Sequence, residues 1–183
     1  MSIPNFITLA RLISVPVTVW LILNGSFAGA FWLFVAAGVS DAIDGVIAKR
    51  FDMETELGQF MDPLADKALL VGVYITLGHT GHLATWLVIL VVFRDLLIIG
   101  GAILFQTITQ SLTMAPLMVS KVNTVAQIML AALLLGTLAY SVDAVAVIDT
   151  MVYIVALTTF ISGAAYVVSW TRRASMMEGD KGS

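Results

Sequence analysis

The sequence predicts an all-α integral membrane protein, a six-transmembrane-helix bundle with both termini on the cytoplasmic or matrix side. Three observations carry this prediction. The chain of 183 residues is 60% hydrophobic and only 11% charged, whereas soluble domains are nearer half apolar and a quarter charged. Its mean hydropathy is +1.00. Apolar runs of about 20 residues, the length that crosses a bilayer, recur along most of the chain.

The first three spans are bounded by polar connections. An apolar run at residues 8–24 ends at the turn "NGS", and the next run, 30–49, ends at the longer connection "RFDMETELGQ". The third span is expected at 60–78, where Pro63 fits because the first helical turn tolerates a residue without a backbone donor. The turn "HTGH" follows this span.

The last three spans follow the same pattern. They are expected at 83–106, 119–139 and 145–171, with "QTITQSLTMAPLM" joining the first two and the turn "YSVDA" joining the last two. No linker indicates a second domain, so residues 1–171 are expected to form one transmembrane domain. Residues 172–183 are polar and are expected to form a frayed C-terminal tail.

The cations indicate the orientation in the membrane. If both termini are cytoplasmic, the turns "NGS", "HTGH" and "YSVDA" lie on the far side, and they contain no Lys or Arg. This asymmetry is the positive-inside pattern. It places residues 50–60 in the cytoplasm or the mitochondrial matrix, and therefore predicts a bacterial or mitochondrial inner membrane. The cations on that side are Arg11, Lys49, Arg50, Lys121, Arg172 and Arg173.

Two pairs of aspartates stand inside the expected spans. Asp41 and Asp44 are three residues apart near the end of the second span, and Asp62 and Asp66 are four apart at the start of the third. Each spacing places its pair on one face of a helix. Because the spans are antiparallel and joined by a short cytoplasmic connection, the four carboxylates are expected to converge on one pocket that opens to the cytoplasm.

Such a convergence predicts a divalent metal site. An Asp at the centre of a membrane helix costs about 2.5–3.5 kcal/mol on insertion scales, and the local cations Lys49 and Lys67 can snorkel away. Four carboxylates provide the all-oxygen ligation that suits Mg²⁺ or Mn²⁺. A cation transporter remains an alternative, although its carboxylates would lie nearer mid-depth. Single carboxylates such as Asp52, Glu54, Glu56, Asp143 and Asp149 are expected to be caps or surface charges.

The acidic pairs lie within a longer pattern. "DAIDGVIAK" at residues 41–49 and "GQFMDPLAD" at residues 58–66 together resemble the signature of the CDP-alcohol phosphatidyltransferases. The departure is Lys49, where that family usually has Arg, although Arg50 follows. Lys keeps the charge but loses the bidentate geometry for phosphate. The matching positions are Asp41, Asp44, Gly45, Ala48, Gly58, Asp62 and Asp66.

The resemblance implies roles for these residues. Asp41, Asp44 and Asp62 would hold divalent metal on the pyrophosphate of CDP-diacylglycerol, and Asp66 would join the metal shell and act as general base. The resemblance also implies a homodimer. The residues expected at the CDP-diacylglycerol site are Gly45, Ala48, Lys49, Arg50, Thr55 and Gly58. Asn5 and Thr8 of "PNFITLAR" are weaker candidates, for which helix capping is the alternative.

Further segments bear on the acceptor. "PNFITLARLISVPV" and "GQFMDPLADKALL" resemble the branch that holds phosphatidylglycerophosphate synthases and eukaryotic-type cardiolipin synthases. "FRDLLIIGGAIL" and "MVSKVNTVAQIMLAALLL" resemble the latter enzymes, which implies phosphatidylglycerol as the acceptor. Glycerol 3-phosphate is the alternative. Its phosphate dianion would need more cations than a monoanionic diester, and Asn123 stands where a second lysine is expected in the glycerophosphate enzymes.

Arg94, Lys121 and Asn123 are the expected acceptor-binding residues. Two of them have a structural alternative. For Arg94 it is an ion pair with Asp95, although neighbouring helix positions point about 100° apart, and for Lys121 it is snorkelling to the membrane surface. No basic tract indicates nucleic acid as a partner, and with no cysteine there is no thiol nucleophile or zinc thiolate site. A nonenzymatic membrane scaffold also remains an alternative.

Overall fold

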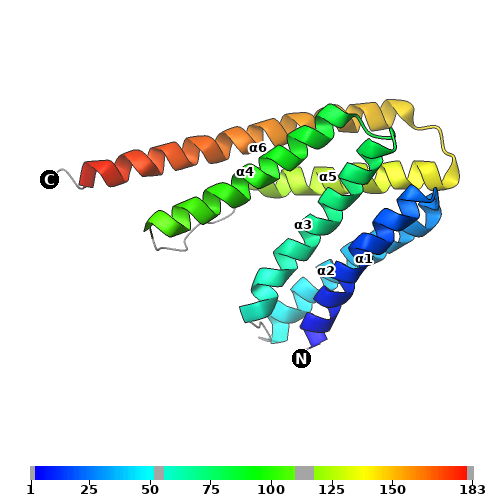
Figure 1. Cartoon of the computed structure of the whole chain (residues 1–183), viewed down its shortest axis with the longest axis horizontal. Coiled ribbons are helices and arrows are strands. Elements are labelled where there is room, and N and C mark those ends of the chain that lie inside the picture. Colours follow the sequence, from blue (N-terminus) through cyan, green and yellow to red (C-terminus); the bar gives the residue numbers. More distant parts are fainter. Residues whose placement is uncertain (1–2, 52–55, 110–117, 181–183) are drawn as a thin grey trace.

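The described part of the chain is entirely helical. A computed structural model describes residues 3–51, 56–109 and 118–180, and within them the side chains of residues 9–40, 67–101, 118–169 and 171. These residues form six helices and no strand, as the sequence predicts. The helices, labelled in Figure 1, are α1 (Ile3–Leu23), α2 (Phe27–Phe51), α3 (Glu56–His79), α4 (Thr85–Thr109), α5 (Met118–Tyr140) and α6 (Val145–Asp180).

Tight turns join the helices at one end of the molecule. The turn between α1 and α2 contains Gly25 at φ +71°, and the turn between α3 and α4 contains Gly81 at φ +79°. Glycine suits this left-handed backbone because it lacks a Cβ atom. Ser141, between α5 and α6, also has a positive φ of 52°. The three expected turns are therefore confirmed.

The last helix differs from its expected length. α6 continues to Asp180, whereas the sequence predicts a frayed tail after Trp170, so that expectation is wrong for residues 171–180. The polar composition of the segment does not prevent helix formation, because Arg, Met, Glu and Ala all have good helix propensity. Other helix boundaries differ from the expected spans by a few residues.

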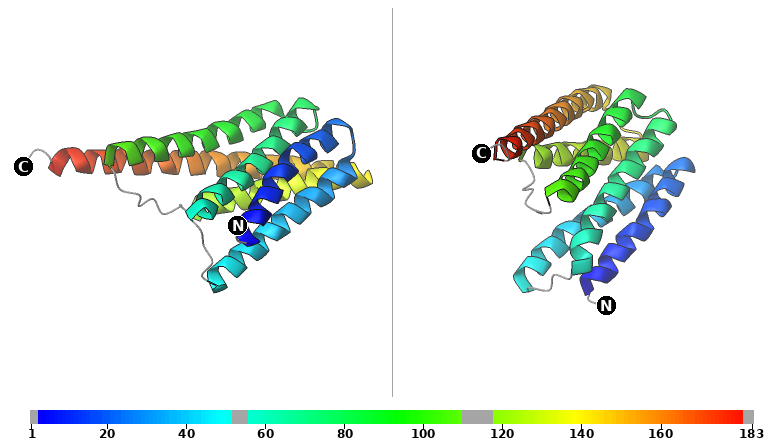
Figure 2. Two further views of the ribbon diagram at one scale, coloured as in Figure 1. Left: turned by 60° about the horizontal axis from the view of Figure 1, so that its bottom comes forward. Right: turned by 60° about the vertical axis from the view of Figure 1, so that its left-hand side comes forward.

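The helices form two groups that meet chiefly where α2 packs against α5. α1 packs against α2 and α3, while α6 packs against α4 and α5. The groups are joined by contacts of α2 with α5 and of α3 with α4 and α5. Figure 2 shows both groups from two further directions. At the end opposite the three turns, the N-terminus of α1, the C-terminal end of α2 and the N-terminal end of α3 lie together (Figure 1).

Apolar side chains lie both inside and outside this bundle. Tyr74, Leu77, Leu87 and Val91 are among the side chains with no exposed surface. Many other large apolar side chains are exposed on the outside, as expected where lipid replaces water. By length and composition, the described helices Met118–Tyr140 and Val145–Ser169 are apolar enough to cross a membrane, and shorter apolar stretches occur at Leu9–Leu23, Phe27–Ser40 and Lys67–His79.

A close approach between α3 and α4 yields a stability prediction. A Cβ atom added at Gly78 would lie 2.8 Å from Cγ2 of Val88, so Gly78→Ala should destabilise the fold by about 1–3 kcal/mol. Thermal unfolding in detergent measures the effect. Val88→Ala should relieve it in the double variant. Gly100→Ala is the matched control because, among the described residues, no atom outside its chain neighbours and its own helix backbone lies within 4 Å of its added Cβ. Equal unfolding temperatures for Gly78→Ala and Gly100→Ala would contradict the prediction.

Candidate functional site

The two aspartate pairs occupy matching positions on consecutive helices. Asp41 lies ten residues before the end of α2 at Phe51, and Asp66 lies ten residues after the start of α3 at Glu56. At 1.5 Å per residue, both are about 15 Å from the connected ends. By the same measure, Asp44 and Asp62 are about 10 Å from those ends. The connection of residues 52–55 keeps the two helix ends within about 18 Å of each other.

The positions of the four aspartates along the two helices are compatible with the expected metal site. The side chains of the four aspartates lie outside the described ones, and among the described residues no group of three or more His, Cys, Asp or Glu side chains is positioned to hold a metal ion. The donor set itself is four carboxylates and no thiolate or imidazole, and oxygen-only donors of this kind suit Mg²⁺ or Mn²⁺. The four aspartates thus fit a divalent cation by donor chemistry and helix register.

The other residues of the expected CDP-diacylglycerol site belong to the same end of the molecule. Asn5 and Thr8 lie in the first turns of α1, and Gly58 lies in the first turn of α3. The remaining residues follow the aspartates on α2, while Thr55 lies outside the described residues. Side-chain orientations at all these positions are likewise outside the described part. The residues on α2 are Gly45, Ala48, Lys49 and Arg50.

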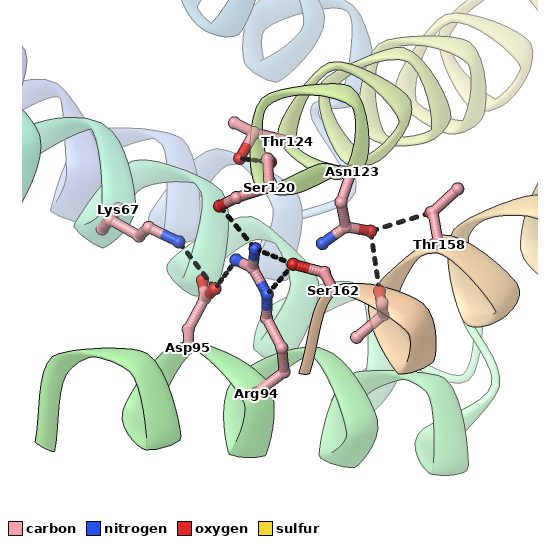
Figure 3. A network of polar contacts seen from close by, with 9 residues as sticks. Lys67, Arg94, Asp95, Ser120, Asn123, Thr124, Thr158 and Ser162 are labelled. Carbon is pink, nitrogen blue, oxygen red and sulfur yellow. Dashed lines mark hydrogen bonds and ion pairs between the residues drawn. The ribbon is translucent and has the colours of Figure 1, made fainter. Parts of the chain in front are cut away.

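A network of polar side chains connects α4 with α5 and α6 (Figure 3). Its centre is Arg94, which is only 2% exposed. Nη1 of Arg94 donates to Oδ1 of Asp95 at 2.7 Å, and Nη2 donates to Oγ of Ser120 at 2.6 Å. Nε and Nη2 both donate to Oγ of Ser162. The guanidinium is thus held by partners on three helices, which compensates its removal from water.

Asp95 also connects this network to α3. Nζ of Lys67 lies 2.6 Å from Oδ1 of Asp95, and the Lys67 side chain is 31% exposed while that of Asp95 is 4% exposed. The same oxygen therefore accepts from two cations, and Oδ2 of Asp95 has no hydrogen-bond partner among the described residues. Because Lys67 follows Asp66 directly, this ion pair ties the helix that carries Asp62 and Asp66 to α4.

Asn123 lies next to this network on α5. The hydroxyls of Thr158 and Thr159 donate to its Oδ1 at 2.8 and 2.9 Å. Asn123 is fully buried, and its Nδ2 has no hydrogen-bond partner among the described side chains. Figure 3 shows this amide nitrogen directed toward the side where Ser162 and Arg94 lie. The arrangement leaves a buried N–H donor that a ligand oxygen or a water can satisfy.

The three expected acceptor-binding residues are only partly brought together. Arg94 and Asn123 are both buried and belong to adjoining polar contacts of α4, α5 and α6. Lys121 is exposed, and no hydrogen bond or ion pair joins it to the described part of this network. Its role as an acceptor contact stays a prediction, as do the roles of Arg94 and Asn123.

Two local inferences from the sequence are corrected here. The angular separation of consecutive helix positions argues against an Arg94–Asp95 pair, but the ion pair is present because the long Arg94 side chain bends back to its neighbour. Lys67 does not snorkel away but binds Asp95. Sequence reasoning also missed Ser120 and Ser162. The sequence did offer one indication that Asp95 is paired, because it stands in mid-span, where an unpaired ionisable residue is energetically costly. Nothing in the sequence indicated that the two serines bind Arg94.

Comparisons with known proteins identify the signature independently. The family model described as CDP-alcohol phosphatidyltransferase matches residues 1–171. The chain is 35% identical over 149 residues to the chloroplastic CDP-diacylglycerol–glycerol-3-phosphate 3-phosphatidyltransferase 1 of Oryza sativa, with 72% of this chain and 45% of the relative covered. It is 32% identical over 152 residues to a probable cardiolipin synthase (CMP-forming) of Drosophila melanogaster, with 74% and 47% covered.

A bacterial relative also matches this chain. A probable phosphatidylglycerophosphate synthase of Mycobacterium tuberculosis is 35% identical over 101 residues, which cover 52% of this chain and 48% of the relative. The chain spans about half the length of the curated relatives that it matches. The names of these relatives therefore divide between cardiolipin synthase and enzymes of phosphatidylglycerophosphate formation.

Proposed function

Because the chain belongs to the CDP-alcohol phosphatidyltransferase family, we propose that it transfers the phosphatidyl group of CDP-diacylglycerol to phosphatidylglycerol and releases CMP, the reaction of a cardiolipin synthase. The observation that carries this proposal is the register of the signature, with two aspartates on α2 and two on α3 at matching distances from the connected helix ends. Consecutive antiparallel helices in this register, whose connected ends lie together (Figure 1), can bring four carboxylates to one pyrophosphate.

The chemistry requires few protein groups. Asp41, Asp44, Asp62 and Asp66 would hold Mg²⁺ or Mn²⁺, which when bound would neutralise the negative charge that develops on the departing CMP. Asp66 accepts the proton of the acceptor hydroxyl as general base. The acceptor oxygen then bonds to the lipid-side phosphorus while the phosphoanhydride bond to CMP breaks.

The CDP-diacylglycerol site is proposed at the end of the molecule where α1 begins, α2 ends and α3 begins. Gly45, Ala48 and Gly58 have small or absent side chains and would let the nucleotide approach the backbone. Lys49 and Arg50 would contact phosphate, and Thr55, Asn5 and Thr8 would supply polar contacts. A site that opens sideways between helices would leave the diacylglycerol chains in lipid.

The acceptor site is proposed at the Arg94 network. One support is that Arg94 is joined through Asp95 to Lys67, the sequence neighbour of Asp66. The other is that Nδ2 of Asn123, which is directed toward the Arg94 side, has no partner among the described residues. Arg94 would attract the phosphodiester of phosphatidylglycerol, and Asn123 would donate to an oxygen of its headgroup. Lys121 would add a second cation from the start of α5.

We place all six helices across a bilayer, with the signature end on the cytoplasmic or matrix side of a bacterial or mitochondrial inner membrane. The support is a set of exposed aromatic side chains near the three tight turns: Trp20, Trp32, Trp86 and Tyr140. Nε1 of Trp32 donates to the Tyr140 hydroxyl at 2.9 Å. Such residues collect at membrane interfaces, and Lys and Arg are absent from those turns. A homodimer remains an expectation from the family resemblance.

An acceptor assay tests this proposal. Purified protein with Mg²⁺ and CDP-diacylglycerol should release CMP when phosphatidylglycerol is added, with at least about tenfold higher kcat/KM than with glycerol 3-phosphate. Product only with glycerol 3-phosphate would favour the second candidate, a phosphatidylglycerophosphate synthase, which the names of the Oryza and Mycobacterium relatives support. Metal movement across sealed vesicles without CDP-lipid would instead indicate a transporter.

A further inference from the structure

The ion pairs around Asp95 define a small cluster of fixed charge. Lys67 and Arg94 both bind Oδ1 of Asp95, and Arg94 and Asp95 are almost fully buried. Ser120 and Ser162 further hold the Arg94 guanidinium. We name Lys67, Arg94 and Asp95 the charge triad. The members of the triad come from α3 and α4, and hydrogen bonds to α5 and α6 hold Arg94 in place. The triad therefore places its charge at a fixed position between the helices.

The triad has two positive groups and one negative group, so its formal net charge is +1. Charges interact strongly in such an environment, since little water screens them. A phosphodiester carries one negative charge and would balance the triad, whereas a phosphate monoester carries nearly two at neutral pH and would leave an excess. The interaction of a dianion with each unit of triad charge is also twice that of a monoanion.

We propose that Asp95 contributes to acceptor specificity, because it lowers the charge of the triad from +2 to +1 and so weakens the attraction of a dianionic phosphate monoester more than that of a monoanionic phosphodiester. The inference rests on the proposed function and names a residue that acts on the acceptor through Lys67 and Arg94. A purely structural Asp95 would instead affect every acceptor alike, which makes the two roles separable.

A series of charge variants tests the proposal. Lys67→Gln, the wild type and Asp95→Asn have triad charges of 0, +1 and +2, and the double variant Lys67→Gln/Asp95→Asn returns to +1. For each full-length protein, kcat/KM is measured by CMP release with phosphatidylglycerol and with glycerol 3-phosphate. Glycerol 3-phosphate is also measured as an inhibitor of the phosphatidylglycerol reaction, so that its binding is quantified even where no product forms.

The ratio of the two kcat/KM values is the diagnostic quantity. The ratio cancels any effect of a substitution on Asp66, the neighbour of Lys67, that changes the reaction with both acceptors equally. We expect Asp95→Asn to lower the preference for phosphatidylglycerol on the order of tenfold and Lys67→Gln to raise it by a similar factor. The double variant and Asp95→Glu should return to within about threefold of the wild type. Asp149→Asn, which removes an exposed carboxylate on α6, is the control and should leave the ratio unchanged.

The outcomes separate the inference from the proposed function. An unchanged ratio in Asp95→Asn, or a double variant that keeps the altered ratio, would show that Asp95 is only structural. If Asp95→Asn does not fold, an unchanged ratio in Lys67→Gln would overturn the inference equally. A wild type that prefers glycerol 3-phosphate would also overturn it while leaving the transferase intact. No CMP release with either acceptor would refute the proposed function itself.

Discussion

Asp66→Asn is expected to abolish phosphatidyl transfer while the protein remains folded. The amide has nearly the same shape as the carboxylate but cannot accept the proton of the acceptor hydroxyl, so a loss of about 10²–10⁴-fold in kcat is expected from the removal of general-base catalysis. CMP release from CDP-diacylglycerol measures the rate. Asp66 also belongs to the proposed metal ligands, and any weaker metal binding would add to this loss.

Matched controls separate this effect from misfolding. Asp149→Asn makes the same chemical change on an exposed part of α6 and should retain full activity. Size-exclusion behaviour and the thermal unfolding temperature in detergent should remain close to those of the wild type for both variants. Near-normal turnover of a folded Asp66→Asn protein would exclude Asp66 as the base, although it would not exclude the family's reaction.

Removal of divalent metal is expected to abolish activity completely and reversibly. Four carboxylates at matching positions on α2 and α3 repel one another unless a cation binds them, and the pyrophosphate adds further negative charge. Treatment with EDTA should therefore stop CMP release, and added Mg²⁺ or Mn²⁺ should restore it. Substantial turnover in excess EDTA would contradict the proposed mechanism.

Metal binding should also appear in the stability of the protein without substrate. A ligand that binds only the folded state stabilises it by about 2.7 kcal/mol at a concentration 100 times its dissociation constant. Saturating Mg²⁺ or Mn²⁺ should therefore raise the unfolding temperature of the wild type. The double variant Asp41→Asn/Asp44→Asn should show a much smaller increase. An equal increase in both proteins would place the metal elsewhere.

Much of the fold was predictable because hydropathy is a local property. An apolar run long enough to cross a bilayer is helical almost regardless of its neighbours, since every backbone polar group must be paired within the segment. The turns at Gly25 and Gly81 followed from short polar sequences for the same local reason. The length of α6 was not predictable in this way, because residues 171–180 are polar and their helix depends on propensity, not on lipid.

The candidate site was also predictable only where it depends on local sequence. The aspartate signature was visible because its spacing has helical periodicity and because carboxylates are expensive in a membrane. The distant partners of Arg94 and Asp95 were not visible. Ser120 and Ser162, which bind Arg94, and Lys67, which binds Asp95, are far away in sequence and are brought there only by the packing of α3, α5 and α6. Even the Arg94–Asp95 pair was misjudged, since side-chain length outweighed the angle between consecutive positions.

The sequence by itself determined the six helices, the three turns, the family and the positions of the aspartates along α2 and α3. Only the tertiary structure decided that Asp95 binds two cations from different helices and that the buried Nδ2 of Asn123 has no partner in the part of the chain that the structure describes. The physical reason is the distance along the chain over which each property acts. Hydropathy and helical periodicity act within a single segment, whereas the charge balance of a buried site depends on which segments pack together.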